Sequence, residues 1–311
     1  LHAAHEGSLD HVEGRRGAPP RLLDVLLDVV DHAVDEGVAQ ALLDGQAPPG
    51  VVALTAYLFP YDTAHQTFVN FHDRDAIASQ TILDAARRDT RFYAGTVAGG
   101  EAAARLVLPR AALHVITGIE HLALLAGLLL LATRQRQAMT FVVAFAAGHL
   151  VSTIVAAYAL VLPPARLIDP ALALAVVYVG ADNLMAADGR DVRAWMAAGM
   201  GVIHGFSIAA DLRTMGFARL ALGWAIAAVH LGLVIALLAV VFALRALFEY
   251  LRNRAGQSSG ERRGGLSAAG TAGPRWFVLS GSAAVIVIGA GWFVQQVFFP
   301  TQSLPGFLPR L

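Results

Sequence analysis

Apolar residues gather into six long stretches in the last two thirds of the chain, with short polar segments between them. Each stretch holds, or nearly holds, the roughly 20 residues that an α-helix needs to cross a bilayer. The stretches cover residues 106–132, 138–162, 171–187, 194–210, 220–248 and 276–299. We therefore predict an all-α polytopic membrane bundle of six transmembrane helices within residues 106–300.

A different pattern marks residues 21–44, where apolar side chains recur at helical spacing beside a row of aspartates. This pattern predicts an amphipathic helix that is too charged to span a membrane. Its acidic stripe is either a solvated face or a docking surface for a basic partner. The stripe consists of Asp24, Asp28, Asp31 and Asp35, and the apolar face of Leu23, Leu27, Val30, Val34 and Val38.

Short segments rich in β-branched and aromatic residues follow, at residues 51–59, 66–71 and 77–84. Turn residues bound them, which predicts strands. With the preceding helix they indicate a small α+β domain over residues 21–105. Residues 1–20 are polar and typical of a flexible arm. The arm is either a solvated terminus or a metal-collecting segment, because it carries His2, His5, Asp10 and His11.

The composition is that of a membrane protein. Hydrophobic residues make up 56% of the chain, charged residues only 15%, and the mean hydropathy is +0.58. The 23 basic and 23 acidic residues balance, so charge does not favour a nucleic-acid partner. The absence of cysteine excludes disulfides, thiolate ligands and cysteine nucleophiles. A metal site must therefore use His, Asp, Glu, Met or backbone oxygen.

Arginines lie in alternate loops between the predicted helices, at positions 134 and 136, 190 and 193, and from 245 to 263. The positive-inside rule places these loops in the cytoplasm. The N-terminal domain and a tail over residues 301–311 are then extracytoplasmic. Residues 256–273 are rich in Gly and Ser and predict a flexible cytoplasmic loop. Because the sequence begins with Leu1, we also expect a processed N-terminus.

Two histidines and a carboxylate lie inside the first apolar stretch. His114 and His121 are seven residues apart, close to two helical turns, so both are expected on nearly the same face with Gly118 between them. Glu120 adds a carboxylate. Ionisable groups at bilayer depth cost a few kcal/mol and usually mark a site or pathway. This face predicts binding of a metal ion or a proton.

Further polar residues in the other stretches extend this set. His149 lies in the second stretch, Asp182 in the third, His204 in the fourth and His230 in the fifth. Each has an alternative role: a histidine can simply hydrogen-bond across helices, and Asp182 can serve as a helix-end residue. Gly201 and Gly205 form a small-xxx-small pattern, which by itself indicates helix packing. The predicted metal residues are His114, Glu120, His121, His149, His204, His230 and Asp182.

Imidazoles with carboxylates and no thiolate suit nickel, copper, zinc, cobalt or iron(II). A transport site must release what it binds, and protonation of histidine near neutral pH weakens a metal site. These residues therefore favour a divalent transition metal as the ligand, without selecting one.

Several motifs resemble the HupE/UreJ family of hydrogenase and urease accessory membrane proteins. The similarity runs from about residue 67 to residue 300. The motifs are Thr67-Phe-Val-Asn70, Ile82-Leu-Asp-Ala85, Tyr93-Ala-Gly-Thr96, the His-x3-Gly-x-acid-His element of residues 114–121, Gly148-His149, Pro163-Pro-Ala-Arg-Leu167, Val177-Tyr-Val-Gly-Ala-Asp-Asn-Leu184 and Ile203-His-Gly-Phe206.

The resemblance implies a multi-pass protein of the bacterial cytoplasmic membrane whose intramembrane histidines bind a transition metal, with nickel the usual assignment. Three features depart from the family pattern. After the His204-Gly-Phe element the family tends to be glycine-rich and apolar, whereas this chain has Ser207 and Asp211. Glu120 replaces the usual Asp, and the fifth stretch reads His230-Leu-Gly-Leu-Val234 where the family typically has Asn-Leu-Gly-Val-Glu.

Three functions fit these observations, and the first two are not enzymatic. The first is a nickel-type permease or metal-delivery accessory protein. The second is a non-transporting subunit that assembles with, or supplies metal to, a metalloenzyme or respiratory complex. The third is an intramembrane metal-dependent hydrolase, since three imidazoles with an open position form a hydrolytic zinc site.

Overall fold

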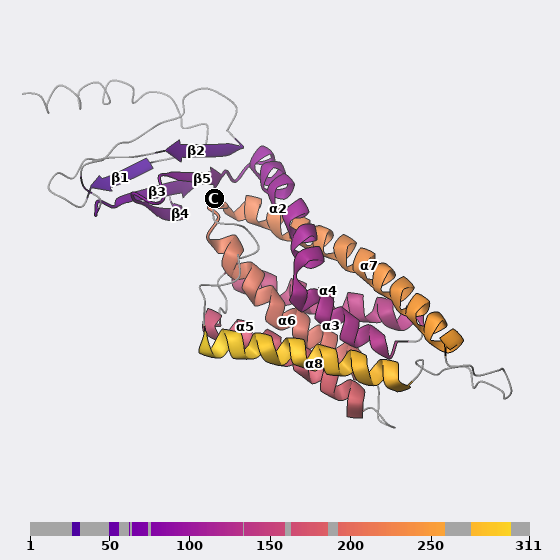
Figure 1. The fold of residues 1–311 in the computed structure, drawn as a ribbon. Helices are drawn as coiled ribbons and strands as arrows, with labels where there is room; N and C mark the ends of the chain where they lie inside the picture. The colour runs from indigo at the N-terminus through magenta and orange to yellow at the C-terminus, as the bar shows by residue number, and fades with distance from the viewer. Residues whose placement is uncertain are drawn as a thin grey trace, which may run out of the picture. The chain divides into compact units, whose positions relative to one another are not determined.

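Strands precede helices along the chain in the computed structural model (Figure 1). The structure describes residues 27–31, 50–55, 62, 64–73, 76–132, 134–158, 163–185, 192–258 and 275–299. The chain divides into two units, one of residues 1–49 and 55–90 and the other of residues 50–54 and 91–311. The predicted arm and C-terminal tail lie outside the described residues.

The first unit contains an antiparallel sheet. Its strands β1 (Leu27–Asp31), β3 (Thr67–Asp73) and β4 (Ala76–Leu83) lie in the order β1-β3-β4. Along β3 the burial alternates as expected for a strand with one buried face, since Val69 and Phe71 are fully buried and Asn70 is half-buried. The strands predicted at residues 66–71 and 77–84 are confirmed.

The helix predicted over residues 21–44 is wrong at residues 27–31, which form β1. This strand pairs with β3 in the register Leu27↔Phe71, Val29↔Val69 and Asp31↔Thr67. Backbone pairing with β3 outweighs the helical spacing of the apolar residues. β-Branched residues such as Val29 and Val30 favour a strand once a partner strand is present. Residues 21–26 and 32–44 lie outside the described part of the chain.

Strand β2 (Val51–Thr55) pairs with β5 (Asp89–Tyr93). The sequence pattern predicted β2 but not β5. The end of β5 is held to the loop after α6, because the Tyr93 amide donates to the Gly216 carbonyl at 2.9 Å and the Ala218 amide donates to the Tyr93 carbonyl at 2.9 Å. The aromatic rings of Tyr93 and Phe217 also lie in contact, with their centres 4.9 Å apart.

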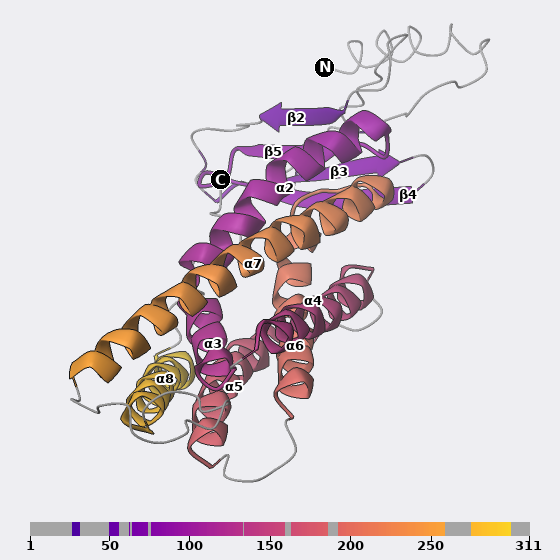
Figure 2. The ribbon, with the colours of Figure 1, turned by 90° about the vertical axis from the view of Figure 1, so that its right-hand side faces the viewer.

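Seven helices follow among the described residues, and each predicted apolar stretch is largely helical. Helix α2 runs beside α7, α4 beside α6 and α5 beside α8 (Figures 1 and 2). The bounds are α2 Val97–Thr117, α3 Ile119–Leu130, α4 Gln135–Ala157, α5 Ala165–Met185, α6 Arg193–Arg213, α7 Arg219–Ser258 and α8 Arg275–Phe298. Residues 256–258 of the predicted loop are thus helical, and residues 259–273 lie outside the described chain.

The first predicted helix is two helices. Gly118 adopts an extended conformation, with φ −71° and ψ 112°, and the axes of α2 and α3 differ by 59°. In a continuous helix, seven residues would separate His114 from His121 by about 10 Å along the axis. The prediction of two side chains on one straight face is therefore wrong, and the two residues instead meet across the bend.

Four helices in the described chain are long and apolar enough to cross a bilayer, namely those at Gln135–Ala157, Arg166–Met185, Arg219–Leu251 and Trp276–Phe298. The bent pair α2–α3 makes a fifth if it is one span. Helix α6 is not among them, since its glycines, His204 and Ser207 reduce its apolar character. The predicted count of six spans is therefore not confirmed by length and composition.

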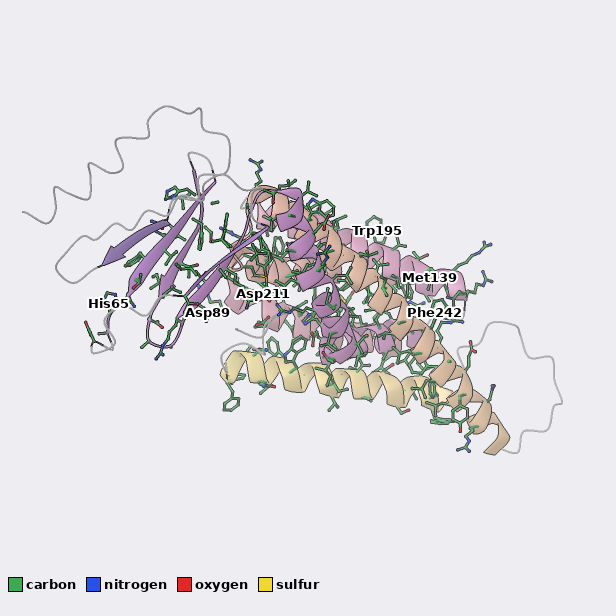
Figure 3. The ribbon with its side chains drawn as sticks, turned by 90° about the horizontal axis from the view of Figure 1, so that it is seen from above. His65, Asp89, Met139, Trp195, Asp211 and Phe242 are labelled. Carbon is green, nitrogen blue, oxygen red and sulfur yellow. The ribbon has the colours of Figure 1, made fainter. Side chains whose placement is uncertain are left out.

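Large apolar side chains cover the outside of these helices. Trp195 on α6 is 81% exposed, and Phe242 on α7 is also exposed (Figure 3). Polar residues such as His121, His149, Thr153 and His204 are buried instead. An apolar exterior, with the few polar side chains buried among the helices, is the arrangement of an integral membrane protein.

Helices α4 and α6 approach each other through glycine. A Cβ atom on Gly201 would collide with the backbone carbonyl of Phe145, whereas one on Gly199 would meet nothing within 4 Å. We expect Gly201→Ala to destabilise the fold by about 1–3 kcal/mol because the helices must separate. Gly199→Ala, two residues away on the same helix, should be neutral or stabilise by up to about 1 kcal/mol. Thermal unfolding of the two variants in detergent compares them, and equal midpoints would contradict this close contact.

Candidate metal centre

Three helices bring four potential metal ligands to one point. His114 lies in the last turn of α2, Glu120 and His121 in the first turn of α3, and His204 in α6. Each offers one ligand atom, and these atoms all lie within 4.8 Å of one another. We call these four residues the His/Glu cluster. Donor atoms on one transition-metal ion lie at most about 4.4 Å apart, so small side-chain shifts are enough to bring this group onto one ion.

Glu120 stands between the two histidines of the bend. Its Oε1 lies 3.3 Å from Nδ1 of His121 and 3.8 Å from Nε2 of His114. The ring centres of His114 and His121 are 5.0 Å apart, and those of His121 and His204 are 4.2 Å apart. One oxygen of Glu120 thus faces the imidazoles of His114 and His121. The imidazole of His204, on α6, lies next to that of His121.

The cluster is sheltered from solvent. His121 is 1% exposed, His204 is 5% exposed, and Glu120 and His114 are half-buried. Nε2 of His121 has no hydrogen-bond partner among the described residues, whereas Nδ1 faces the Glu120 carboxylate at 3.3 Å. A buried polar group without a partner is rare and calls for an explanation such as a bound ion. The donor set therefore fits a cation.

Gly118 makes this geometry possible. A Cβ atom at this position would lie 2.5 Å from Oε1 of Glu120, 2.7 Å from the His114 carbonyl and 2.8 Å from Nδ1 of His121. Only a residue without a side chain leaves room for the Glu120 carboxylate, the His121 imidazole and the His114 carbonyl in their present positions. The break between α2 and α3 is therefore part of the site.

The remaining predicted residues lie outside the cluster. His149 on α4 is fully buried, and its Nδ1 lies 2.9 Å from Nε2 of His230 on α7. Its ring centre is 6.3 Å from that of His204. Asp182 on α5 is half-buried and is not one of the four clustered residues. Its neighbour Asn183 instead links two helices, donating to the Gly127 carbonyl on α3 at 2.8 Å.

Sequence reasoning missed two residues near the site. Thr153 lies one turn after His149, and its hydroxyl is 3.3 Å from Nδ1 of that histidine. The i, i+4 spacing was a readable signal. Asp169 on α5 interacts electrostatically with Glu120. It precedes the predicted stretch of residues 171–187, so it was not counted among the intramembrane acids.

Apolar helices that enclose a buried group of imidazoles and a carboxylate define a multi-pass membrane protein with a candidate cation site. The chain belongs to the HupE/UreJ family, because the family model described as HupE / UreJ protein matches residues 94–296. The predicted family is confirmed. Neither a curated protein nor a solved structure matches the chain.

The family match begins at Ala94, directly before the first helix, and extends into α8. It therefore includes all four residues of the His/Glu cluster together with His149 and His230, and excludes the sheet of the first unit.

Proposed function

We propose that this protein is a membrane permease or delivery protein for a divalent transition metal, with the His/Glu cluster as the binding site of its cargo. The observation that carries the proposal is the convergence of His114, Glu120, His121 and His204 within 4.8 Å inside an apolar helical unit. Membership of the HupE/UreJ family supports a metal-related role and makes nickel the first metal to test.

The roles of the four residues follow from their chemistry. The imidazoles supply neutral nitrogen donors of intermediate softness, and Glu120 supplies one negative charge that offsets the charge of the ion. Glu120 also lies in the first turn of α3, where the helix dipole stabilises a carboxylate. A helix that is interrupted at an ion site is a recurrent feature of membrane transporters, because the break frees space and backbone for the ion.

The same proposal includes six membrane crossings, with α2–α3 as one of them and α6 as another. The 21 residues of α6 span about 30 Å, which matches the hydrocarbon thickness of a bilayer. Its weaker apolar character is explained by the polar residues that it directs to the site and by its packing against α4. With six crossings and the arginine-bearing loops in the cytoplasm of a bacterial cell, both chain ends lie on the extracytoplasmic side of the inner membrane.

Binding and uptake of metal test this function directly. Purified protein would be offered Ni²⁺, Co²⁺, Zn²⁺ or Cu²⁺ separately, with bound metal measured by elemental analysis and uptake measured in proteoliposomes. We expect about one tightly bound ion per chain for the cargo metal, and uptake above that of empty liposomes. Failure to bind any of the four metals would contradict the proposal.

The same measurements separate a permease from an accessory subunit. Stoichiometric binding without uptake would favour a protein that holds metal for a metalloenzyme or respiratory complex. That reading predicts a partner that co-purifies after gentle solubilisation.

A further inference from the structure

His149 and His230 form a second histidine pair, next to the His/Glu cluster but not within it. Nδ1 of His149 lies 2.9 Å from Nε2 of His230, and their ring centres are 4.9 Å apart. His149 comes from α4 and His230 from α7. Each imidazole has two nitrogens that can exchange roles, so the contacts of the pair decide which nitrogen carries a proton.

The backbone determines the proton on His230. Its Nδ1 lies 2.8 Å from the carbonyl oxygen of Ile226, one turn earlier on α7. A carbonyl oxygen only accepts, so Nδ1 of His230 must be the donor. With a neutral ring, which an apolar surrounding favours, Nε2 of His230 then carries a lone pair and accepts from Nδ1 of His149.

Thr153 leads independently to the same assignment. Its hydroxyl donates to the Gly205 carbonyl at 3.2 Å, which uses its only proton. The Thr153 oxygen also lies 3.3 Å from Nδ1 of His149, where it can only accept. Both neighbours of Nδ1 therefore require that this nitrogen of His149 carries the proton.

The other nitrogen of His149 is left without a proton and without a partner. His149 is fully buried, and its Nε2 has no hydrogen-bond partner among the described residues. A metal-binding histidine typically donates one ring N–H to a protein acceptor and presents the other nitrogen to the ion. His149 has this arrangement, whereas both nitrogens of His230 are occupied.

The distance to His204 allows a shared ion. With metal–nitrogen bonds of about 2.0–2.1 Å, two imidazoles on one ion have ring centres at most about 6.5 Å apart, and they approach this limit only when the two nitrogens lie on nearly opposite sides of the ion. The ring centres of His149 and His204 lie 6.3 Å apart. Because His204 also belongs to the His/Glu cluster, its imidazole can contact an ion in the cluster or an ion beside His149.

We infer that His149 forms a second station for the metal, reached from the His/Glu cluster through the shared His204. His230 is a positioning residue in this arrangement, because it holds the proton on Nδ1 of His149 and so keeps Nε2 available. This inference rests on the proposed permease function and adds to it a route beyond the first binding site.

Three variants test the second station in proteoliposomes with ⁶³Ni²⁺, or with whichever of the four metals the wild type carries. His149→Ala removes the station, and His230→Leu removes the acceptor of the Nδ1 proton. His230→Gln retains an acceptor, because the amide oxygen can replace the imidazole lone pair. We expect equilibrium Kd values within threefold of wild type for all three variants, since the His/Glu cluster is intact. Retained binding also shows that each variant is folded.

Uptake should fall more than tenfold in His149→Ala and His230→Leu and recover to at least half of the wild-type rate in His230→Gln. ¹⁵N NMR of histidine-labelled protein should show His149 protonated at Nδ1 in the wild type and in His230→Gln. Uptake by His149→Ala within twofold of wild type would overturn the second station, and so would a tenfold loss of metal affinity in that variant, which would place His149 in the first site. Lack of metal binding by the wild type would instead remove the proposed function itself. Binding without uptake would favour the accessory subunit and would overturn the second station with the permease on which it rests.

Discussion

Replacing both His114 and His121 by alanine is expected to weaken metal binding by more than about 100-fold. Loss of a residue that only supports a ligand typically costs 10–100-fold in affinity, so removal of two direct ligands should cost at least as much. Glu120 and His204 would remain, and two ligands from different helices do not hold a divalent ion tightly. The measurement is equilibrium binding of metal to the purified variant, followed by elemental analysis after gel filtration.

A matched control is available in the first unit. His65 and His72 are also seven residues apart, and neither belongs to the His/Glu cluster. His65→Ala together with His72→Ala removes the same two functional groups and should leave the metal content within twofold of wild type. Equal metal content in the two double variants would refute the cluster as the cargo site, provided that both proteins elute as monodisperse species.

Gly118→Ala should reduce metal affinity by about 10–100-fold, although no ligand is removed. The added methyl group would lie 2.5 Å from Oε1 of Glu120 and 2.8 Å from Nδ1 of His121, so both side chains must move away from their present positions. Rotation of the carboxylate alone cannot relieve the contact, because the His114 carbonyl is only 2.7 Å from the same point. A change in the α2–α3 bend is the expected response, and it would separate His114 from His121.

Gly199→Ala is the appropriate comparison for this variant, because its added methyl group meets no atom within 4 Å. The comparison separates the effect of a methyl group at residue 118 from the effect of adding a methyl group to any glycine of these helices. Isothermal titration with the cargo metal measures both affinities. If Gly118→Ala bound metal as tightly as Gly199→Ala, the break at residue 118 would have no role in arranging the ligands.

The helical unit was largely predictable because its signal is local. Apolar stretches of about 20 residues are recognisable from hydropathy, and the helices found here overlap all six of them. Strands were harder. The pattern at residues 27–31 also satisfied a helical period, and only pairing with β3 decided in favour of a strand. Strand β5 has just five residues and is defined by partners distant in sequence.

The residues that gather in the candidate site could be singled out from the sequence, but their geometry could not. His114, Glu120, His121 and His204 stood out because ionisable groups are costly in apolar stretches. Their convergence depends on a bend that the sequence marks with a single glycine. The separate roles that we propose for His149 and His230 depend on their contacts with Thr153 and Ile226. Asp182 has the same chemical signal but lies outside the cluster.

Hydropathy and residue chemistry were therefore enough to determine the class of protein and the group of residues from which a metal site could form, and the resemblance of several motifs pointed to the family. These properties depend on transfer of side chains from water and on ligand type, both of which belong to each residue wherever it lies. Tertiary structure alone decided that α2 and α3 meet at an angle, that α6 adds His204 to the His/Glu cluster and that His149 faces His230. Those outcomes depend on packing between helices far apart in sequence, where a missing Cβ atom or one carbonyl determines how closely two side chains approach.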